Sequence, residues 1–356
     1  MKKHNFSAGP CILPETVLQK ASEAVLNFNG IDLSLIEISH RSADFVAVMD
    51  KARALVKELL ALPEGYSVLF LQGGASLEFL MAPYNLLSTE GTAGYLDTGA
   101  WSAKALKEAR GLGKVEVLAS SKDKGYNYIP KDYNLPSGLD YLHCTSNNTI
   151  YGTQFKDFPE TDSLLVCDMS SDIFSRELDF SKFDLVYAGA QKNMGPAGTT
   201  LVIVKEEILG KIDRDIPSML DYQVHLSKDS MFNTPPVFAV YVSMLTLEWL
   251  KDLGGVKAIE KINEEKASLL YAEIDRNPLF KGFAEVADRS LMNVTFTLTD
   301  DTHKDLFDRL WNDAGISGIK GHRSVGGYRA SIYNAMPLSS VQALIDVMQA
   351  FEQQVN

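Results

Sequence analysis

The chain has few cysteines, no long hydrophobic run and no excess of positive charge. Its 356 residues include Cys11, Cys144 and Cys167, whose spacing fits neither paired disulfides nor a metal site. We therefore expect free thiols in a reducing compartment, and a cytoplasmic protein. No window holds roughly 18 consecutive apolar residues, and no signal-peptide pattern is seen at the N-terminus, so we expect no association with membranes.

Acidic residues outnumber basic ones. The chain has 46 Asp and Glu against 34 Lys and Arg, a net charge of −12. Such a chain repels a phosphate backbone, which argues against nucleic-acid binding. Any anionic ligand therefore needs a local cluster of cations that acts against the overall field.

Length and composition indicate a globular protein with a large domain and a smaller one. Apolar residues make up 46% and charged residues 22%, and there is no repeat, low-complexity segment or linker rich in Ser or Pro. Through the first two-thirds of the chain, short apolar runs alternate with amphipathic stretches. This pattern predicts α/β structure with a mostly parallel sheet, whose strands are apolar on successive residues because both faces are covered. The strands that we predict are 67–71, 115–118, 141–144, 164–167, 185–188 and 200–204.

The last third of the chain has an α+β pattern of its own. Pro235-Pro236 precedes a long apolar helix that Gly254-Gly255 ends. We predict a large domain over residues 13–250, and a small domain formed by 1–12 and 251–356. The small-domain elements that we predict are helices 256–276, 302–314 and 339–353 and strands 292–298 and 327–332.

A glycine-rich turn follows the first predicted strand of the sheet. In Gly73-Gly74-Ala75-Ser76 the glycines allow backbone N–H groups to approach a ligand, and the next helix begins there. A helix N-terminus attracts phosphate, and open α/β sheets bind ligands at the carboxyl ends of their strands. An ordinary tight turn explains the same residues equally well.

An aspartate and a lysine end two other predicted strands. Asp168 follows a buried apolar run, and Lys192 follows another and is surrounded by glycines and alanines. Each residue alone is more simply a salt-bridge partner or a surface charge. Together with the glycine-rich turn they are the set that pyridoxal phosphate needs: a lysine bonded to its aldehyde carbon, and an aspartate that keeps its pyridine nitrogen protonated.

Two further residues follow strands on the same edge. Trp101 lies at a strand-to-helix junction, where an indole either stacks on the cofactor ring or packs the helix on the sheet. The hydroxyl of Thr149 either reaches the cofactor or caps a turn.

Longer strings of residues carry a resemblance to a known family. The chain resembles the phosphoserine aminotransferases, pyridoxal phosphate enzymes of the aspartate aminotransferase fold (fold type I), nearly end to end. The strings that carry the resemblance are residues 5–10, 40–42, 73–76, 187–193, 231–236, 321–323 and 329–337.

The resemblance implies a role for each candidate cofactor residue. Lys192 would carry the cofactor covalently, Asp168 would contact the pyridine nitrogen and Trp101 would stack on the ring. The residues implied at the phosphate end and beside the ring are Ala75, Ser76, Gln191 and Thr149. Asn233 and Thr234 would reach the cofactor of a second subunit, which implies a homodimer.

The resemblance also implies the reaction. It is amino transfer from L-glutamate to 3-phosphohydroxypyruvate, with the precursor of 4-phosphohydroxy-L-threonine as a further substrate. These substrates carry an α-carboxylate and a second anion, so cations must hold both ends. Arg329 suits the carboxylate, His322 and Arg323 suit the phosphate, and the resemblance adds Arg41.

Three alternative functions compete with this one, and the residues argue against each. A serine–pyruvate aminotransferase shares the fold but has no second anion to bind. A cysteine desulfurase needs a cysteine in a mobile loop late in the chain, and none is there. A pyridoxal phosphate-binding protein without turnover would have no need for the whole set of charged residues.

Overall fold

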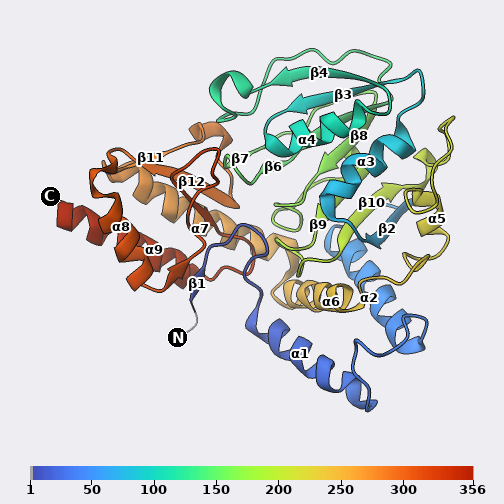
Figure 1. Ribbon diagram of the computed structural model, residues 1–356, viewed down its shortest axis with the longest axis horizontal. Coiled ribbons are helices and arrows are strands. Elements are labelled where there is room, and N and C mark those ends of the chain that lie inside the picture. The colour runs from blue at the N-terminus through green and yellow to red at the C-terminus, as the bar shows by residue number, and fades with distance from the viewer. Residues whose placement is uncertain (1–2, 356) are drawn as a thin grey trace.

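A seven-stranded sheet forms the centre of the larger part of the protein. The computed structural model describes residues 3–355, and Figure 1 shows the sheet in the larger lobe at the right. All neighbouring strands are parallel except β10, which runs antiparallel to β2 and β9. The prediction of α/β structure with a mostly parallel sheet is confirmed. The strands in spatial order are β2 (Tyr66–Leu71), β10 (Thr200–Lys205), β9 (Leu185–Gly189), β8 (Leu164–Asp168), β5 (Tyr141–Thr145), β3 (Thr92–Asp97) and β4 (Lys114–Ser120).

Helices cover both faces of this sheet. Alternate residues of β2 show the division, since Val68 and Phe70 pack into one apolar cluster and Leu69 and Leu71 into another. The helices of the first cluster are α1 (Glu15–Leu26), α2 (Ala43–Leu59) and α6 (Val237–Asp252), in the lower part of Figure 1. Those of the second are α3 (Gly74–Leu86), α4 (Ala100–Ala109) and α5 (Tyr222–Leu226).

The edge strand β4 departs from the two-sided burial that the apolar runs indicate. Val117, in its centre, is 43% exposed. The neighbouring strand β3 was not among the predicted strands, because Thr92, Gly94 and Asp97 interrupt its apolar residues.

The C-terminal part builds a second, smaller core. A three-stranded antiparallel sheet packs against helices around residues such as Phe280, Phe296 and Phe307. The elements are α7 (Gly255–Arg276), β11 (Phe280–Gly282), β12 (Asn293–Leu298), α8 (Lys304–Asp313), β14 (Tyr328–Ser331) and α9 (Leu338–Val355). The N-terminal strand β1 (His4–Asn5) pairs with β13 (Ile316–Ser317). The domain division stays our proposal, and this pairing supports its N-terminal part.

Buried amide side chains join the two parts. Asn147 donates to Asn293 Oδ1 over 2.8 Å, and Asn193 Oδ1 accepts the Asn334 backbone N–H over 3.0 Å. All four asparagines are buried, so both partners of each hydrogen bond lose water and depend on each other. These bonds hold the small sheet at a defined position beside the carboxyl ends of the large one.

Within residues 3–355, every helix is too short or too polar to span a lipid bilayer.

A buried acid ties α3 to α5. Glu78 is fully buried, and its Oε2 accepts a hydrogen bond from the Tyr222 hydroxyl over 2.5 Å. Burial raises the pKa of Glu78 to about 8, although the Tyr222 hydrogen bond acts in the opposite direction. The folded protein therefore holds Glu78 mainly as the neutral acid at pH 7.

We expect the Glu78→Gln variant to show, through the pH dependence of stability, that Glu78 is protonated in the folded protein. The unfolded pKa is about 4.5, so the stability contributed by the protonated carboxyl is complete below that pH and is lost as the pH rises towards about 8. Relative to the variant, the wild type should lose free energy of unfolding over this range, by at most roughly 1.4 kcal/mol per pH unit. Urea unfolding of both proteins at several pH values measures it. A difference that does not change with pH would contradict the assignment.

Candidate active site

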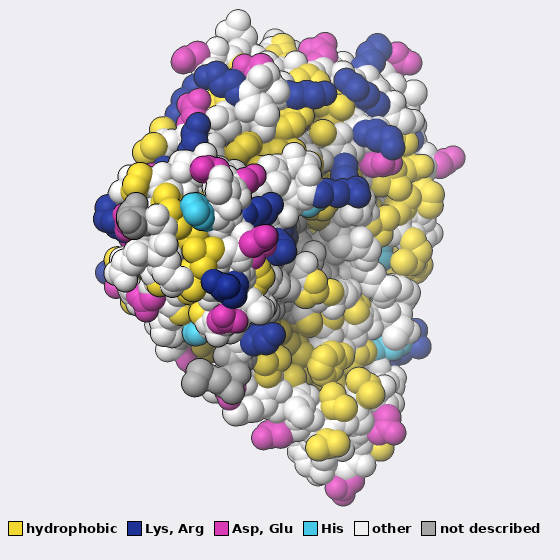
Figure 2. All heavy atoms as spheres, turned by 60° about the vertical axis from the view of Figure 1, so that its left-hand side comes forward, with side chains coloured by type: hydrophobic (Ala, Val, Ile, Leu, Met, Phe, Trp, Pro, Cys, Tyr) yellow, Lys and Arg dark blue, Asp and Glu magenta, His cyan; other side chains and the backbone are white. Residues whose placement is uncertain are grey.

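A cavity of about 360 Å³ lies at the carboxyl ends of the central strands, where the small sheet meets the large one. Figure 2 shows the hollow between the two lobes, with Lys and Arg side chains along its border. The predicted site residues that line the cavity are Ala75, Ser76, Trp101, Thr149, Asp168, Gln191, Lys192, His322 and Arg329.

Lys192 lies just beyond β9, with its amine directed at Thr149. Its Nζ donates to Thr149 Oγ1 over 2.8 Å, and no ion pair of the described chain includes it. Burial lowers the pKa of Lys192 to about 8, while the charge of Asp168 acts in the opposite direction. A substantial fraction of the amine is therefore neutral near physiological pH, which is the nucleophilic form.

Asp168 ends β8 and is 4% exposed. Its Oδ1 accepts the Ser170 backbone N–H over 2.9 Å. Burial raises the pKa of Asp168, while hydrogen bonds from Ser170 and the charge of Lys192 act to lower it. A buried carboxylate with so little compensation is matched best by a cationic N–H group of a ligand.

The turn before α3 presents unpaired backbone donors to the cavity. Gly73 and Gly74 have φ angles of 92° and 65°, in the left-handed region, and a Cβ on Gly73 would lie 2.5 Å from Leu77 Cβ. No side chain caps the N-terminus of the helix. The first amides of α3 and the Ser76 hydroxyl are thus available to a phosphate.

Trp101 forms one wall of the cavity in the first turn of α4. Its ring centroid lies 5.9 Å from Lys192 Nζ, and its Nε1 is buried without a partner. A second amine, Lys104 Nζ, lies 4.3 Å from the same centroid. We did not predict Lys104 from the sequence, although its spacing of three residues from Trp101 places both on one face of the helix.

Two basic residues enter the cavity from the C-terminal part of the chain. Arg329, on β14, donates to the Thr149 carbonyl over 3.4 Å, and its Nε is buried without a partner. His322 lies in the preceding loop, where its Nδ1 pairs with Ser324 Oγ over 2.7 Å. Burial, followed by the charges of Arg329, Arg323 and Lys104, lowers the pKa of His322.

Four predicted site residues do not line the cavity of this chain: Arg41, Arg323, Asn233 and Thr234. Arg41 and Arg323 are exposed. The Thr234 carbonyl accepts a hydrogen bond from Gln72 Nε2 over 2.7 Å, while its side chain is outside the cavity.

The chain matches the family described as aminotransferase class-V over residues 3–344. It belongs to that family. This aminotransferase is 68% identical over 356 residues to the phosphoserine aminotransferase of Flavobacterium johnsoniae, with 100% of both chains covered. It is 58% identical to that of Parabacteroides distasonis, with 99% of this chain and 100% of the relative covered.

Solved structures of aminotransferases are also similar to this chain. The phosphoserine aminotransferase from Bacillus circulans subsp. alkalophilus superposes with a TM-score of 0.97 at 44% identity, over 100% of this chain and 99% of the other. An aspartate aminotransferase from Thermus thermophilus shares the fold, with a TM-score of 0.80 at 18% identity, over 99% of each chain. Pyridoxal phosphate is the cofactor of the class-V aminotransferases, and of this one.

The cavity fits this cofactor at each of its reactive ends. The amine of Lys192, which has a hydroxyl but no carboxylate partner in the described chain, suits the aldehyde. The buried carboxylate of Asp168 suits the ring nitrogen, and the uncapped α3 N-terminus suits the phosphate. Trp101 supplies a flat wall. The enzyme therefore has a partner for each polar group before the cofactor arrives.

We expect Asp168→Asn to slow turnover more than it weakens cofactor binding. Losing a charge-assisted hydrogen bond costs about 1.5–3 kcal/mol in binding. The loss in rate should exceed this, because the amide cannot hold the ring proton as charge develops in the transition state. The measurements are kcat at saturating cofactor and the cofactor Kd, with Asp157→Asn at the surface as control. A kcat that falls only in step with occupancy would refute this role.

Proposed function

We propose that this aminotransferase transfers the amino group of L-glutamate to 3-phosphohydroxypyruvate, giving O-phospho-L-serine and 2-oxoglutarate. The observation that carries the proposal is the presence of basic side chains on two elements: Arg329 on β14, and the loop with His322, which also lines the cavity, and Arg323, whose charge acts on His322. A substrate with an anion at each end uses both. The names of relatives that cover the whole chain support the same substrates.

Different residues of the site would bind the cofactor and move the proton. Bound pyridoxal phosphate draws electrons from the substrate Cα, which allows an amino group to be exchanged with a 2-oxo acid. Lys192 would hold it through its amine and, once released, take the proton from the substrate Cα and return it at the cofactor's aldehyde carbon. Asp168 would hold the proton of the ring nitrogen. Ala75, Ser76 and Gln191 would bind the phosphate, with Trp101 and Thr149 against the ring.

Arg329 is suited to the substrate α-carboxylate. Its guanidinium is partly buried and its Nε is unpaired, so a bidentate carboxylate would satisfy a donor that has no partner in the described chain. His322 and Arg323, on an open loop, would bind the distal anion. The precursor of 4-phosphohydroxy-L-threonine carries the same two anions, and we propose it as a second substrate.

The cysteines argue against a desulfurase. Cys144 and Cys167 are buried, and the Cys11 thiol donates to the Lys192 carbonyl over 2.6 Å. Burial also raises the pKa of Cys11 to about 12, which suppresses the thiolate. All three thiols are free, which supports our expectation of the cytoplasm.

The two ends of the substrate should separate by mutation. We expect His322→Asn and Arg323→Met to lower kcat/KM for 3-phosphohydroxypyruvate more than for hydroxypyruvate, which lacks the phosphate. Arg329→Met should lower both, because both carry an α-carboxylate, by roughly ten-fold or more. Arg110→Met, at an exposed position directly after α4, is the control. Equal losses on both substrates in all three site variants would show that the ends are misassigned, and no glutamate-dependent amination by the wild type would refute the function.

We further propose a homodimer with shared sites. Asn233 and Thr234 lie outside the cavity of their own chain, beside the exposed apolar residues Phe232 and Phe238, each 37% exposed. Apolar side chains next to an outward polar pair suit a subunit interface, from which the pair would reach the phosphate of the other subunit's cofactor. Arg41, exposed before α2, would join the substrate site in the same way.

A complementation experiment tests the shared site. A Lys192→Ala chain is mixed with a chain carrying Asn233→Ala and Thr234→Ala, under conditions that allow exchange of subunits. Each mixed dimer then has one complete site of two, so an equal mixture should recover about a quarter of wild-type activity. No recovery despite exchange shown by mass spectrometry, or a monomer at assay concentration, would overturn the proposal.

A further inference from the structure

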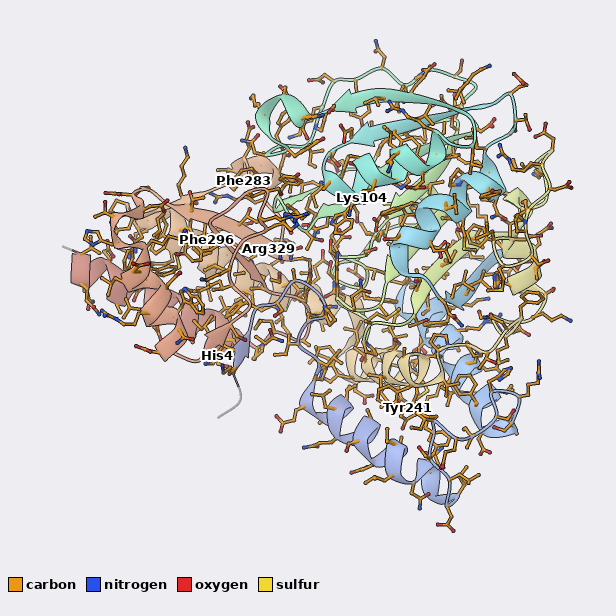
Figure 3. The ribbon with its side chains drawn as sticks, viewed as in Figure 1. His4, Lys104, Tyr241, Phe283, Phe296 and Arg329 are labelled. Carbon is orange, nitrogen blue, oxygen red and sulfur yellow. The ribbon has the colours of Figure 1, made fainter. Side chains whose placement is uncertain are left out.

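Cations from both parts of the chain lie near the cavity: Arg329 lines it, and Lys104 contacts Trp101, which lines it. Figure 3 shows Arg329 on the small-domain side and Lys104 on the large-domain side. Lys104 extends from α4 and places its Nζ over the Trp101 ring, 4.3 Å from the centroid. Trp101 itself lines the cavity together with His322 and Arg329. The ammonium is thus held at the cavity wall by an aromatic contact instead of extending freely into solvent.

Nothing in the described chain neutralises this amine. Lys104 is absent from every ion pair within residues 3–355, whereas Lys51, Lys124 and Lys131 each have a carboxylate partner. The absence of a partner leaves its charge available to an external anion. It also keeps the mouth of the cavity positive in a protein whose net charge is −12.

Lys104 acts on the same group that faces the distal anion. Besides burial, the charges that lower the pKa of His322 are all cations: Arg329, Arg323 and Lys104. Lys104 belongs to α4, whereas Arg323 and Arg329 belong to the C-terminal part, so charges from both parts of the chain act on His322. A neutral His322 supplies a hydrogen bond but no charge, and a phosphoryl group carries about −1.5 to −2 near pH 7. Within one subunit, Arg323 alone does not balance that charge.

We propose that Lys104 is a specificity-determining residue that binds the distal phosphoryl group of the substrate from the large-domain wall, opposite His322 and Arg323. This inference rests on the proposed function. The γ-carboxylate of L-glutamate carries a single charge, so it gains less from a second cation than a phosphoryl group does. Lys104 thus favours binding of O-phospho-L-serine, while the half-reaction with L-glutamate depends less on Lys104.

Three variants test the proposal: Lys104→Met, Lys104→Arg and, as matched control, Lys107→Met, one turn further along α4 and also exposed. For Lys104→Met we expect KM for O-phospho-L-serine to rise roughly five- to ten-fold with little change in kcat, and KM for L-glutamate to rise about two-fold at most. Lys104→Arg keeps the charge and should recover most of the loss. Lys107→Met should match the wild type.

A binding measurement without turnover accompanies the kinetics. Inorganic phosphate is titrated into the holoenzyme by calorimetry, and Lys104→Met should bind it several-fold more weakly than the wild type and Lys107→Met do. If Lys104→Met loses glutamate and phosphoserine activity equally and releases cofactor, Lys104 only supports Trp101 and the proposal is wrong. It is equally wrong if Lys104→Met behaves like Lys107→Met. A wild type inactive on phosphoserine would instead refute the proposed function, whatever the variants do.

Discussion

Burial of the central strands on both faces determines where polar chemistry can occur in this protein. Strands such as β8 and β9 are apolar on successive residues, and helices exclude water from both of their faces. A charged side chain within such a strand would lose its hydration without compensation. Charges are therefore restricted to strand ends, and parallel strands bring those ends to one edge of the sheet. Asp168 and Lys192 meet at that edge for this reason.

Incomplete compensation of buried charge gives the site its reactivity. Lys192 has a hydroxyl for a partner instead of a carboxylate, and its pKa falls to about 8. Asp168 experiences the opposite shift, also from burial. An incoming ligand can compensate both groups, because its aldehyde reacts with the Lys192 amine and its basic ring nitrogen pairs with the Asp168 carboxyl. The folding of the apoprotein thus bears a cost that binding of pyridoxal phosphate relieves.

The position of the C-terminal part, with its smaller sheet, completes the site. Buried asparagine pairs join it to the large domain, and each pair would leave unsatisfied amide groups if the domains separated. Arg329 and His322 thereby reach a cavity whose floor belongs to the large domain. An enzyme with an excess of acidic residues can attract two anions here because its basic side chains are concentrated in one place, and Asp168 is the one acidic residue of the described chain that lines the cavity.

The sequence by itself determined the elements with strong local signals. Apolar runs bounded by turns identified six of the seven strands of the large sheet, and the Pro235-Pro236 and Gly254-Gly255 pairs marked both ends of α6 closely. Asp168 and Lys192 were predicted because strand-end charges among small residues are uncommon and chemically specific. Strand β3 was not predicted, because glycine and polar residues interrupt its apolar run, and because its burial comes from strands that are distant in sequence.

Only the tertiary structure decided which cations share the cavity. A lysine on an exposed helix face has the same local sequence pattern whether it faces solvent or the edge of a site. For Lys104 the difference comes from the packing of α4 on the sheet and from the loop that carries His322, more than 200 residues away in sequence. Electrostatic interactions depend on distance in space, and distances between remote segments are set only when both cores have formed.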